Sequence, residues 1–150
     1  MTDFSYLNVD NAYKLINQKV TKTPLVTNDY INNLLEAEIY FKLENLQNTG
    51  SFKLRGATHK ITKLIETVKD SGVVAYSSGN HAQAVAYASM INSISAKIIM
   101  PKTAPQIKIE NTKNYGAEVI LYDTYFQNRE EIGIKIQKKD NRALIKPYDC

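Results

Sequence analysis

This sequence is poor in the residues that build covalently linked or metal-stabilised folds. A single cysteine, Cys150, ends the 150-residue sequence, which excludes an internal disulfide framework and a cysteine metal site. Tryptophan is absent, and the six glycines are isolated from one another. The sequence therefore has neither a dinucleotide-binding fingerprint nor a glycine-rich phosphate loop. No cluster of histidine, cysteine and carboxylate residues has the spacing of metal ligands, so we expect no metal site.

Long runs of one residue class are missing as well. No apolar stretch reaches the length of a membrane span, and the N-terminus lacks the charged-then-apolar pattern of a secretory signal. The net charge is +4, and the basic residues are interspersed with acidic ones. This distribution gives nucleic-acid binding little support. We therefore expect a soluble, cytoplasmic protein with neither a membrane nor a nucleic acid as its partner.

The composition is that of a folded domain. Hydrophobic residues make up 43% of the chain and charged residues 23%, as in ordinary globular proteins. A chain of 150 residues can bury one substantial core but is short for two complete domains.

From about residue 70, short apolar runs alternate with segments of helical periodicity. We expect strands over residues 73–76, 96–100, 118–122 and 143–145, and helices that begin near residues 80, 105 and 124. Strands that alternate with helices indicate βαβ units, because parallel strands need a crossover connection. The predicted fold class is α/β, with an open parallel sheet of about four strands and flanking helices.

The first third of the chain is less regular. A helix after Ser51, a plausible cap, has an apolar side that runs to Val68. Before it we expect a helix over residues 9–20, an extended Thr23–Leu25, a helix over 31–35 capped by Thr27 or Asn28, and a half-buried strand over 39–43.

The stretch Phe41–Gly56, FKLENLQNTGSFKLRG, places a lysine at the start of that predicted helix. Lys53 falls in the first turn beside Phe52, and an electropositive helix N-terminus disfavours an ammonium there. A lysine partly buried against an aromatic ring suits a covalent bond to a carbonyl cofactor. A solvated surface lysine would have the same sequence pattern, so the residues alone leave both interpretations open.

A second polar segment, Ser77-Ser78-Gly79-Asn80-His81, joins a predicted strand to the next helix. Ligands bind at that end of the strands in open α/β sheets. The side chains, together with the free N–H groups of the helix N-terminus, predict an anion site for a carboxylate or phosphate. Simple capping by Ser78 or Asn80 and packing of His81 explain the same residues. His59 is expected on the solvated side of its helix.

Taken together, these segments resemble the fold-type II pyridoxal-phosphate enzymes, most closely the threonine/serine dehydratase and serine racemase group. The resemblance covers nearly the whole chain from about residue 12. A departure is Ala84, where many relatives have glycine. The residues that carry the resemblance are Thr23-Pro24-Leu25, Tyr40–Gln47, Thr49–Ala57, Ser77–Gln83, Met100-Pro101-Lys102, Pro105–Lys108, Gly116–Val119 and Lys146–Asp149.

The resemblance implies pyridoxal 5′-phosphate as the cofactor. Lys53 would bind it covalently and then remove the α-proton of the substrate. Phe52 would pack near the cofactor ring, and Asn80 would hydrogen-bond its 3′-oxygen.

The resemblance also implies a small hydroxy amino acid as the substrate. Ser77, Asn80 and His81 would hold its carboxylate, and Ser78 stands where racemase-like members place the acid/base group of the opposite face. The implied reaction eliminates water from L-threonine or L-serine and gives a 2-oxo acid and ammonia. A serine racemase-type activity, a catalytically inactive truncated α/β module and a generic anion-binding α/β domain are alternatives.

The family's members continue about as far again and form homo-oligomers. The resemblance therefore implies that the chain is the N-terminal half of the family fold. Residues 1–47 would be a segment of an incomplete large domain, and residues 48–150 would form the small α/β domain with the lysine and asparagine motifs.

Overall fold

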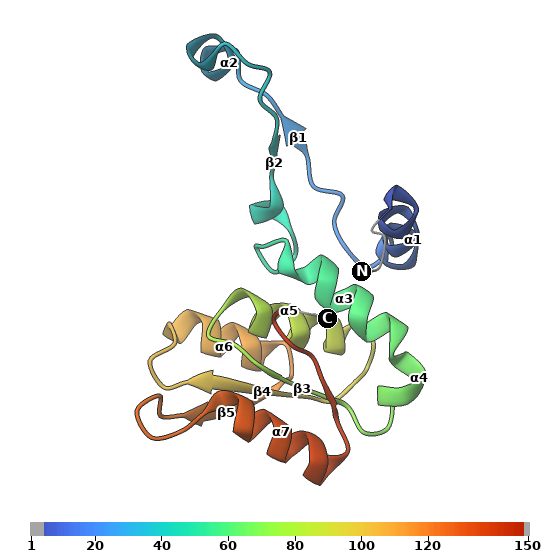
Figure 1. The fold of residues 1–150 in the computed structure, drawn as a ribbon, viewed down its shortest axis with the longest axis vertical. Coiled ribbons are helices and arrows are strands. Elements are labelled where there is room, and N and C mark those ends of the chain that lie inside the picture. The colour runs from blue at the N-terminus through green and yellow to red at the C-terminus, as the bar shows by residue number, and fades with distance from the viewer. Residues whose placement is uncertain (1–4, 149–150) are drawn as a thin grey trace.

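A computed structural model describes residues 5–148, so Cys150 lies outside the described residues. It consists of an α/β body from which an arm projects (Figure 1). In chain order the elements are α1 (Tyr6–Ile16), β1 (Leu25–Val26), α2 (Asp29–Leu35), β2 (Phe41–Lys42), the 3₁₀ turn η1 (Glu44–Leu46), α3 (Lys53–Lys63), α4 (Ile65–Val68), β3 (Val73–Tyr76), α5 (Asn80–Met90), β4 (Ala96–Pro101), α6 (Gln106–Asn114), β5 (Glu118–Tyr122), α7 (Arg129–Asp140) and β6 (Ala143–Leu144).

The body is built on a four-stranded sheet with the strand order β5-β4-β3-β6. All neighbouring pairs in this sheet are parallel. Every residue of β3 is buried, as expected for a central parallel strand that is covered on both faces. The predicted α/β class and the four predicted strands are therefore confirmed.

Successive residues of β3 face opposite sides of the sheet, so the strand contributes to two cores. Val73 and Ala75 lie in a large core with residues of α3, α5 and α6. Val74 and Tyr76 lie in a smaller core against α7. The helices therefore form layers on both faces of the sheet, with α3 as an additional layer over α5 (Figure 1).

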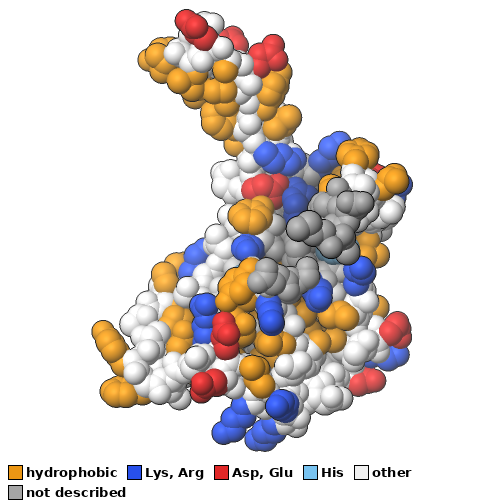
Figure 2. Space-filling view, viewed as in Figure 1, with side chains coloured by type: hydrophobic (Ala, Val, Ile, Leu, Met, Phe, Trp, Pro, Cys, Tyr) orange, Lys and Arg blue, Asp and Glu red, His pale blue; other side chains and the backbone are white. Residues whose placement is uncertain are grey.

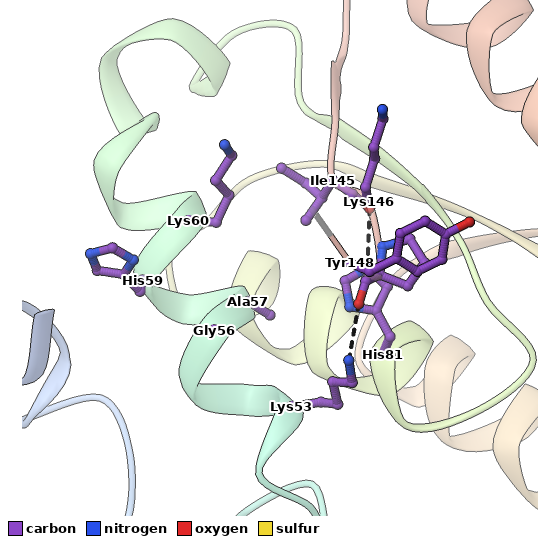
Figure 3. A pocket seen from close by; sticks show the side chains of 10 residues that line it. Lys53, Gly56, Ala57, His59, Lys60, His81, Ile145, Lys146 and Tyr148 are labelled. Carbon is purple, nitrogen blue, oxygen red and sulfur yellow. Dashed lines mark hydrogen bonds between the residues drawn. The ribbon is translucent and has the colours of Figure 1, made fainter. Parts of the chain in front are cut away.

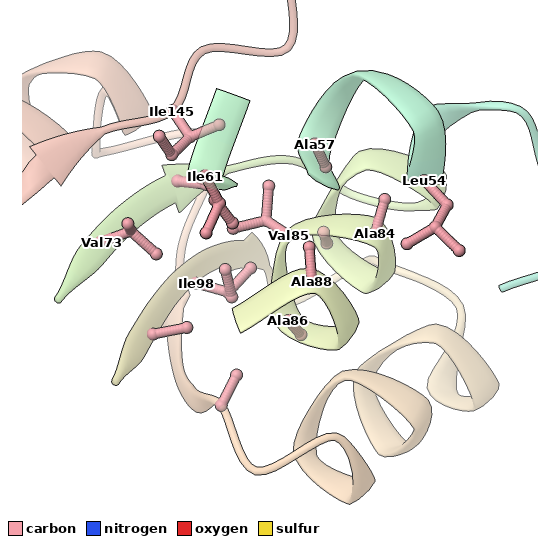
Figure 4. Close-up of a cluster of buried hydrophobic side chains, with 14 of the residues drawn as sticks. Leu54, Ala57, Ile61, Val73, Ala84, Val85, Ala86, Ala88, Ile98 and Ile145 are labelled. Carbon is pink, nitrogen blue, oxygen red and sulfur yellow. The ribbon is translucent and has the colours of Figure 1, made fainter. Parts of the chain in front are cut away.

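The contact between α3 and α5 is close because α5 offers small side chains. Ala84 and Ala88 are fully buried there, facing the α3 residues Leu54 and Ala57 (Figure 4). Burying an aliphatic side chain such as Leu54 contributes about 1.5–3 kcal/mol. Ala84, which departs from the glycine that the family resemblance predicts at this position, fits this interface without exposure. The packing fixes the direction in which α3 presents its first turn.

Several predicted helix boundaries were wrong by a few residues. The first helix covers Tyr6–Ile16 rather than 9–20. The last helix begins at Arg129 rather than near 124 because the Asn128 side chain accepts hydrogen bonds from the N–H groups of Glu130 and Glu131. Such side-chain capping fixes where a helix begins.

The predicted cap at Ser51 was also wrong. Helix α3 begins after Phe52, and no side chain caps it. The Ser51 hydroxyl is buried and has no hydrogen-bond partner among residues 5–148. The same helix ends at Lys63, and a separate short helix follows at Ile65. In contrast, Asn28 caps α2 as predicted, by accepting from the N–H of Ile31.

Residues 21–47, which we call the arm, project from the body. Strands β1 and β2 pair antiparallel over two residues each, and both are exposed. The prediction of a half-buried strand over 39–43 was therefore wrong in length and in burial. Helix α2 buries no residue. Many large apolar side chains of the arm lie open to solvent (Figure 2). They are Leu25, Val26, Tyr30, Leu34, Leu35, Tyr40, Phe41 and Leu46.

We expect the arm to open far more often than the sheet. A ribbon this short and a seven-residue helix bury too little apolar surface to be stable by themselves. Amide hydrogens of β1, β2 and α2 should therefore exchange at least about 100-fold faster than those of β3 and β4. Residue-resolved hydrogen exchange measures both sets together. Equal protection in β1 and β3 would contradict the expectation.

Candidate active site

The carboxyl ends of β3 and β6 meet at one edge of the sheet. Helix α5 leads from β3 to β4, whereas α7 brings the chain back to β6 on the other side of β3. Neighbouring strands whose connections run in opposite directions leave a crevice at their carboxyl ends, and ligands bind in such crevices. The segments 77–80 and 145–148 follow β3 and β6 there.

A cavity of about 200 Å³ opens beside this edge (Figure 3). Its walls come from one face of α3, the first turn of α5 and the segment after β6. The positions 53, 56, 57 and 60 recur at helical spacing, which places them on one side of α3. The lining residues are Lys53, Gly56, Ala57, His59, Lys60, His81, Ile145, Lys146, Pro147 and Tyr148.

Lys53 presents its amine to this cavity from the first turn of α3. Its Nζ donates a hydrogen bond to the carbonyl oxygen of Pro147 at 2.9 Å. The same nitrogen lies 5.5 Å from the centroid of the Phe52 ring. The Phe52 side chain is 60% exposed, so one aromatic face stands open next to the amine.

His81 forms the opposite wall and is 7% exposed. Its Nε2 lies 3.1 Å from the carbonyl oxygen of Ile145; because a carbonyl only accepts, Nε2 carries the proton and donates. Burial lowers the pKa of His81, and the nearby Lys53 charge lowers it further, against the opposing effect of the Ile145 hydrogen bond. His81 is therefore a neutral brace between α5 and the segment after β6.

The polar segment before α5 lies outside the cavity lining. Ser77 is half-buried, and its Oγ accepts from the N–H of Gly79 at 3.3 Å. Ser78 and Asn80 are exposed, and no side chain caps α5. Asn80 Oδ1 accepts from Lys108 Nζ at 2.9 Å. Simple capping thus does not account for Ser78 and Asn80.

The structure brings Lys53 and His81 together in one cavity, with Phe52 beside the lysine. The roles assigned to these residues and to the polar segment stay predictions. For His81, a carboxylate contact would have to use the backbone N–H, since Nε2 donates to Ile145 and Nδ1 of the neutral ring only accepts.

The sequence interpretation missed several residues of the cavity wall. His59 was expected on the solvated surface but is half-buried and lines the cavity; burial and the charges of Lys63 and Lys60 lower its pKa. Lys60 also belongs to the wall. Its position two helical turns after Lys53 was a readable signal, whereas nothing local in the sequence places Lys146 or Tyr148 there.

The base of the arm is tied to α3 only two residues from Lys53. Arg55 donates through Nε and Nη2 to the two carboxylate oxygens of Glu44, at 3.0 and 2.7 Å. Thr23 Oγ1 donates to Glu44 at 2.6 Å, and Arg55 also donates to the carbonyl of Thr21 at 3.1 Å. The Arg55 hydrogen bonds lower the pKa of Glu44. We call this network the arm tether.

Residues 5–148 contain no group of three or more His, Cys, Asp or Glu side chains placed to hold a metal ion. Over the same residues, the helices are too short or too polar to cross a bilayer.

Comparison with known proteins gives consistent matches. The family described as "Pyridoxal-phosphate dependent enzyme" matches residues 16–150. The chain is 43% identical over 145 residues to the L-threo-3-hydroxyaspartate ammonia-lyase of Saccharomyces cerevisiae, covering 97% of this chain and 44% of that protein. It is 42% identical to the L-threonine ammonia-lyase of Thermotoga maritima, covering 95% of this chain and 35% of that protein.

Among solved structures, the serine racemase of Dictyostelium discoideum superposes with a TM-score of 0.89 and 40% sequence identity. The match covers 96% of this chain and 47% of that one. The chain thus spans less than half the length of these relatives.

Arg55→Met tests the arm tether. The variant leaves the Glu44 carboxylate without its bidentate partner, and a hydrogen bond to a charged group is worth about 1.5–3 kcal/mol. Amide exchange at Thr21 and Gln47 should become about 10- to 100-fold faster. Arg129→Met on α7 is the control and should leave those two amides unchanged. Identical exchange rates in wild type and Arg55→Met would show that the arm tether does not stabilise this part of the chain.

His81 predicts a pH dependence of stability. Its folded-state pKa lies below the ordinary 6.5, so the unfolded chain takes up the proton first as the pH falls. The stabilisation is complete above about pH 6.5 and is lost as the pH falls through the folded-state value. His59 acts with the same sign.

His81→Gln keeps a donor for the Ile145 carbonyl but does not titrate. Its free energy of unfolding, measured with urea, should change less between about pH 7 and 5 than that of wild type. His59→Gln, at a more exposed position, provides the comparison. An unaltered pH slope in His81→Gln would show that the imidazole is not the titrating group.

Proposed function

Because the chain belongs to the fold-type II pyridoxal-phosphate-dependent enzymes, in the group of serine racemases and threonine dehydratases, we propose that Lys53 is its cofactor-binding lysine. The proposed reaction is the elimination of water from a small hydroxy amino acid. The proposal rests mainly on one observation: the Lys53 amine lines a cavity at the carboxyl edge of the sheet.

The residues around the cavity are compatible with pyridoxal phosphate. Lys53 would hold its aldehyde carbon through Nζ, the exposed face of Phe52 would cover the ring, and the exposed amide of Asn80 would bind the 3′-oxygen. Among residues 5–148, the lining contains no carboxylate that would repel an anionic cofactor. When bound, the cofactor supplies an electron sink for the pair of electrons released at the substrate's α-carbon.

Lys53 also acts as the general base. Its hydrogen bond to the Pro147 carbonyl keeps Nζ at the cavity rather than in bulk solvent. A side chain held at a fixed place can take up the α-proton and return it later, which is the usual part of a positioned acid/base group. The proton therefore moves to and from Nζ.

The start of α5 orients the substrate. An 11-residue helix without a side-chain cap leaves its first N–H groups available, and such a helix end attracts a carboxylate. Ser77 and Asn80 would add side-chain donors, and His81 its backbone N–H. The carboxylate would then be held at the end of α5 while the α-proton faces Lys53.

In the overall reaction the substrate loses a proton from its α-carbon and a hydroxide from its β-carbon, which together leave as one water molecule. The dehydrated amino acid is then hydrolysed to a 2-oxo acid and ammonia. Printed names among the relatives include ammonia-lyases for threonine and for threo-3-hydroxyaspartate. Threonine, serine and 3-hydroxyaspartate are the candidate substrates.

A racemase activity is the second candidate, and Ser78 favours it. Racemisation needs a second acid/base group on the face opposite the lysine. Ser78 is exposed beside the anion-binding end of α5, and no side chain caps that helix. Its hydroxyl could deliver a proton to the opposite face of the α-carbon.

We extend the proposal to the organisation of the protein. Residues 1–47 would belong to a larger unit of the fold, and residues 48–150 would form the unit that carries the site. The uncovered apolar side chains of the arm and the length of the relatives beyond the matched region support this division. Assembly into homo-oligomers is part of the same proposal.

The cofactor assignment is tested by borohydride trapping. The 150-residue chain is incubated with pyridoxal phosphate and reduced, and the modified lysine is identified by mass spectrometry. We expect one dominant adduct, on Lys53, with at least about tenfold less total labelling in Lys53→Ala. Lys63→Ala, at the end of the same helix, should label like wild type.

Two results would overturn parts of the proposal. A dominant adduct on another lysine would make the Lys53 assignment wrong. Labelling no stronger than in unfolded chain would favour the inactive α/β module for this chain.

A further inference from the structure

Helices α5 and α6 lie side by side on one face of the sheet (Figure 1). They follow the parallel strands β3 and β4, so both begin at the carboxyl edge of the sheet. Two side-chain hydrogen bonds join them. Lys108 Nζ donates to Asn80 Oδ1 at 2.9 Å, and Asn111 Nδ2 donates to Gln83 Oε1 at 3.1 Å. The partners are 28 residues apart in both bonds, so the helices run parallel in one register.

The second of these bonds fixes the register. Gln83 is only 2% exposed, and a buried amide oxygen needs a donor, which Asn111 supplies. On α6 the side chains of Ile109 and Thr112 are buried as well. A helix held in this way cannot slide along its neighbour. Lys108 lies three residues before Asn111, on the same side of α6, and the register therefore brings it to Asn80.

Lys108 determines which end of the Asn80 amide is free. An ammonium group only donates hydrogen bonds, so the atom that it contacts must be the amide oxygen. The Nδ2 group of Asn80 keeps both of its N–H donors, and it donates to none of residues 5–148. Asn80 is exposed at the first position of α5. Its two donors are therefore available to a ligand.

The charge of Lys108 is not balanced by a carboxylate within residues 5–148. Lys97 and Lys102 form ion pairs there, whereas Lys108 forms none. A cation on the oxygen side of an amide polarises it and strengthens its N–H donors. The same charge favours the ionised form of a ligand oxygen that those donors bind. The Asn80 amide therefore suits an anionic oxygen better than a neutral hydroxyl.

We propose that Lys108 is a positioning residue: it holds the Asn80 amide with its N–H donors free, so that they bind the 3′-oxygen of pyridoxal phosphate in its deprotonated form. The inference rests on the proposed function, which assigns that oxygen to Asn80. Lys108 acts through Asn80 and touches neither the cofactor nor the substrate. The bond between Asn111 and Gln83 maintains the register that this role requires.

The first measurement uses the cofactor-free chain and NMR spectroscopy. Lys108→Met keeps most of the aliphatic side chain but cannot donate, so the side-chain amide signal of Asn80 should shift. Lys113→Met removes the same charge from the same helix, at a residue that has no hydrogen bond to Asn80, and should leave the signal in place. Lys108→Arg keeps a charged donor and should resemble wild type. An unmoved Asn80 signal in Lys108→Met would overturn the proposal.

The second measurement tests the preference for an anionic oxygen. Pyridoxine 5′-phosphate has the ring oxygen but no aldehyde, so it cannot react with Lys53, and its 3-O-methyl ether cannot ionise at that oxygen. In NMR titrations, wild type, Lys108→Arg and Lys113→Met should bind the parent compound at least about fivefold more tightly than the ether. In Lys108→Met this preference should fall below about twofold.

Two results of these titrations would overturn the proposal. The same preference in Lys108→Met as in wild type would show that the lysine only packs the two helices together. Failure of both compounds to bind to wild type would show that the Asn80 amide does not form a site for this oxygen.

A double-mutant cycle tests whether Lys108 acts through Asn80. Lys108→Met alone should weaken the binding of pyridoxine 5′-phosphate about three- to tenfold. In an Asn80→Ala background the same substitution should change the affinity less than about twofold, because the residue that it positions is gone. Additive losses would show that the lysine charge acts on the ligand directly and would refute the positioning role.

These outcomes are distinct from those of borohydride trapping. A preference that depends on Lys108, without a trapped lysine, would overturn the Lys53 assignment and keep the role of Lys108. Trapping at Lys53 without that preference would do the reverse.

Discussion

The packing of α3 against α5 is the contact on which the candidate site depends. Helix α3 carries Lys53 and helix α5 carries His81. The two helices meet through side-chain packing. Their distance is set by small side chains such as Ala57, Ala84 and Ala88, which let the helices approach closely. A cavity between helices keeps its width only if such an interface cannot slide, and close-packed interiors resist sliding. The Lys53 amine is thereby positioned by an apolar contact.

Two carbonyl groups of the segment after β6 complete the site. Pro147 receives the Lys53 amine, and Ile145 receives the His81 ring. Both contacts lie close to where β6 pairs with β3, so the sheet, α3 and α5 converge on one short segment. Burial in this convergence is the main cause of the lowered pKa of His81, and the charge of Lys53, which lies close by, lowers that pKa further. The position of the amine and the neutral state of the imidazole therefore have a common structural origin.

The arm has the opposite character to the body. Most of its large apolar side chains are exposed, yet its base is fixed to α3 by Arg55 and Glu44. A partner surface that packed against the arm would therefore be connected to the first turn of α3 through the Arg55–Glu44 hydrogen bonds. The local sequence correctly indicated strand-forming residues at Phe41, but burial depends on a partner surface, and none of residues 5–148 provides it. That is why the prediction of a half-buried strand was wrong.

The sequence by itself determined the parallel sheet, because continuous apolar runs such as β3 and the periodic helices between them can bury their surfaces in only a few ways. It also determined the lysine and asparagine segments, because their residues are contiguous. Only the tertiary structure decided that His81 is a brace, that His59 is half-buried and that Lys60 and Lys146 share one wall. Those facts depend on distances between segments up to 94 residues apart, and no local pattern encodes such distances. Residues 41–56 therefore identify Lys53 as the candidate lysine, and the folded chain supplies its surroundings.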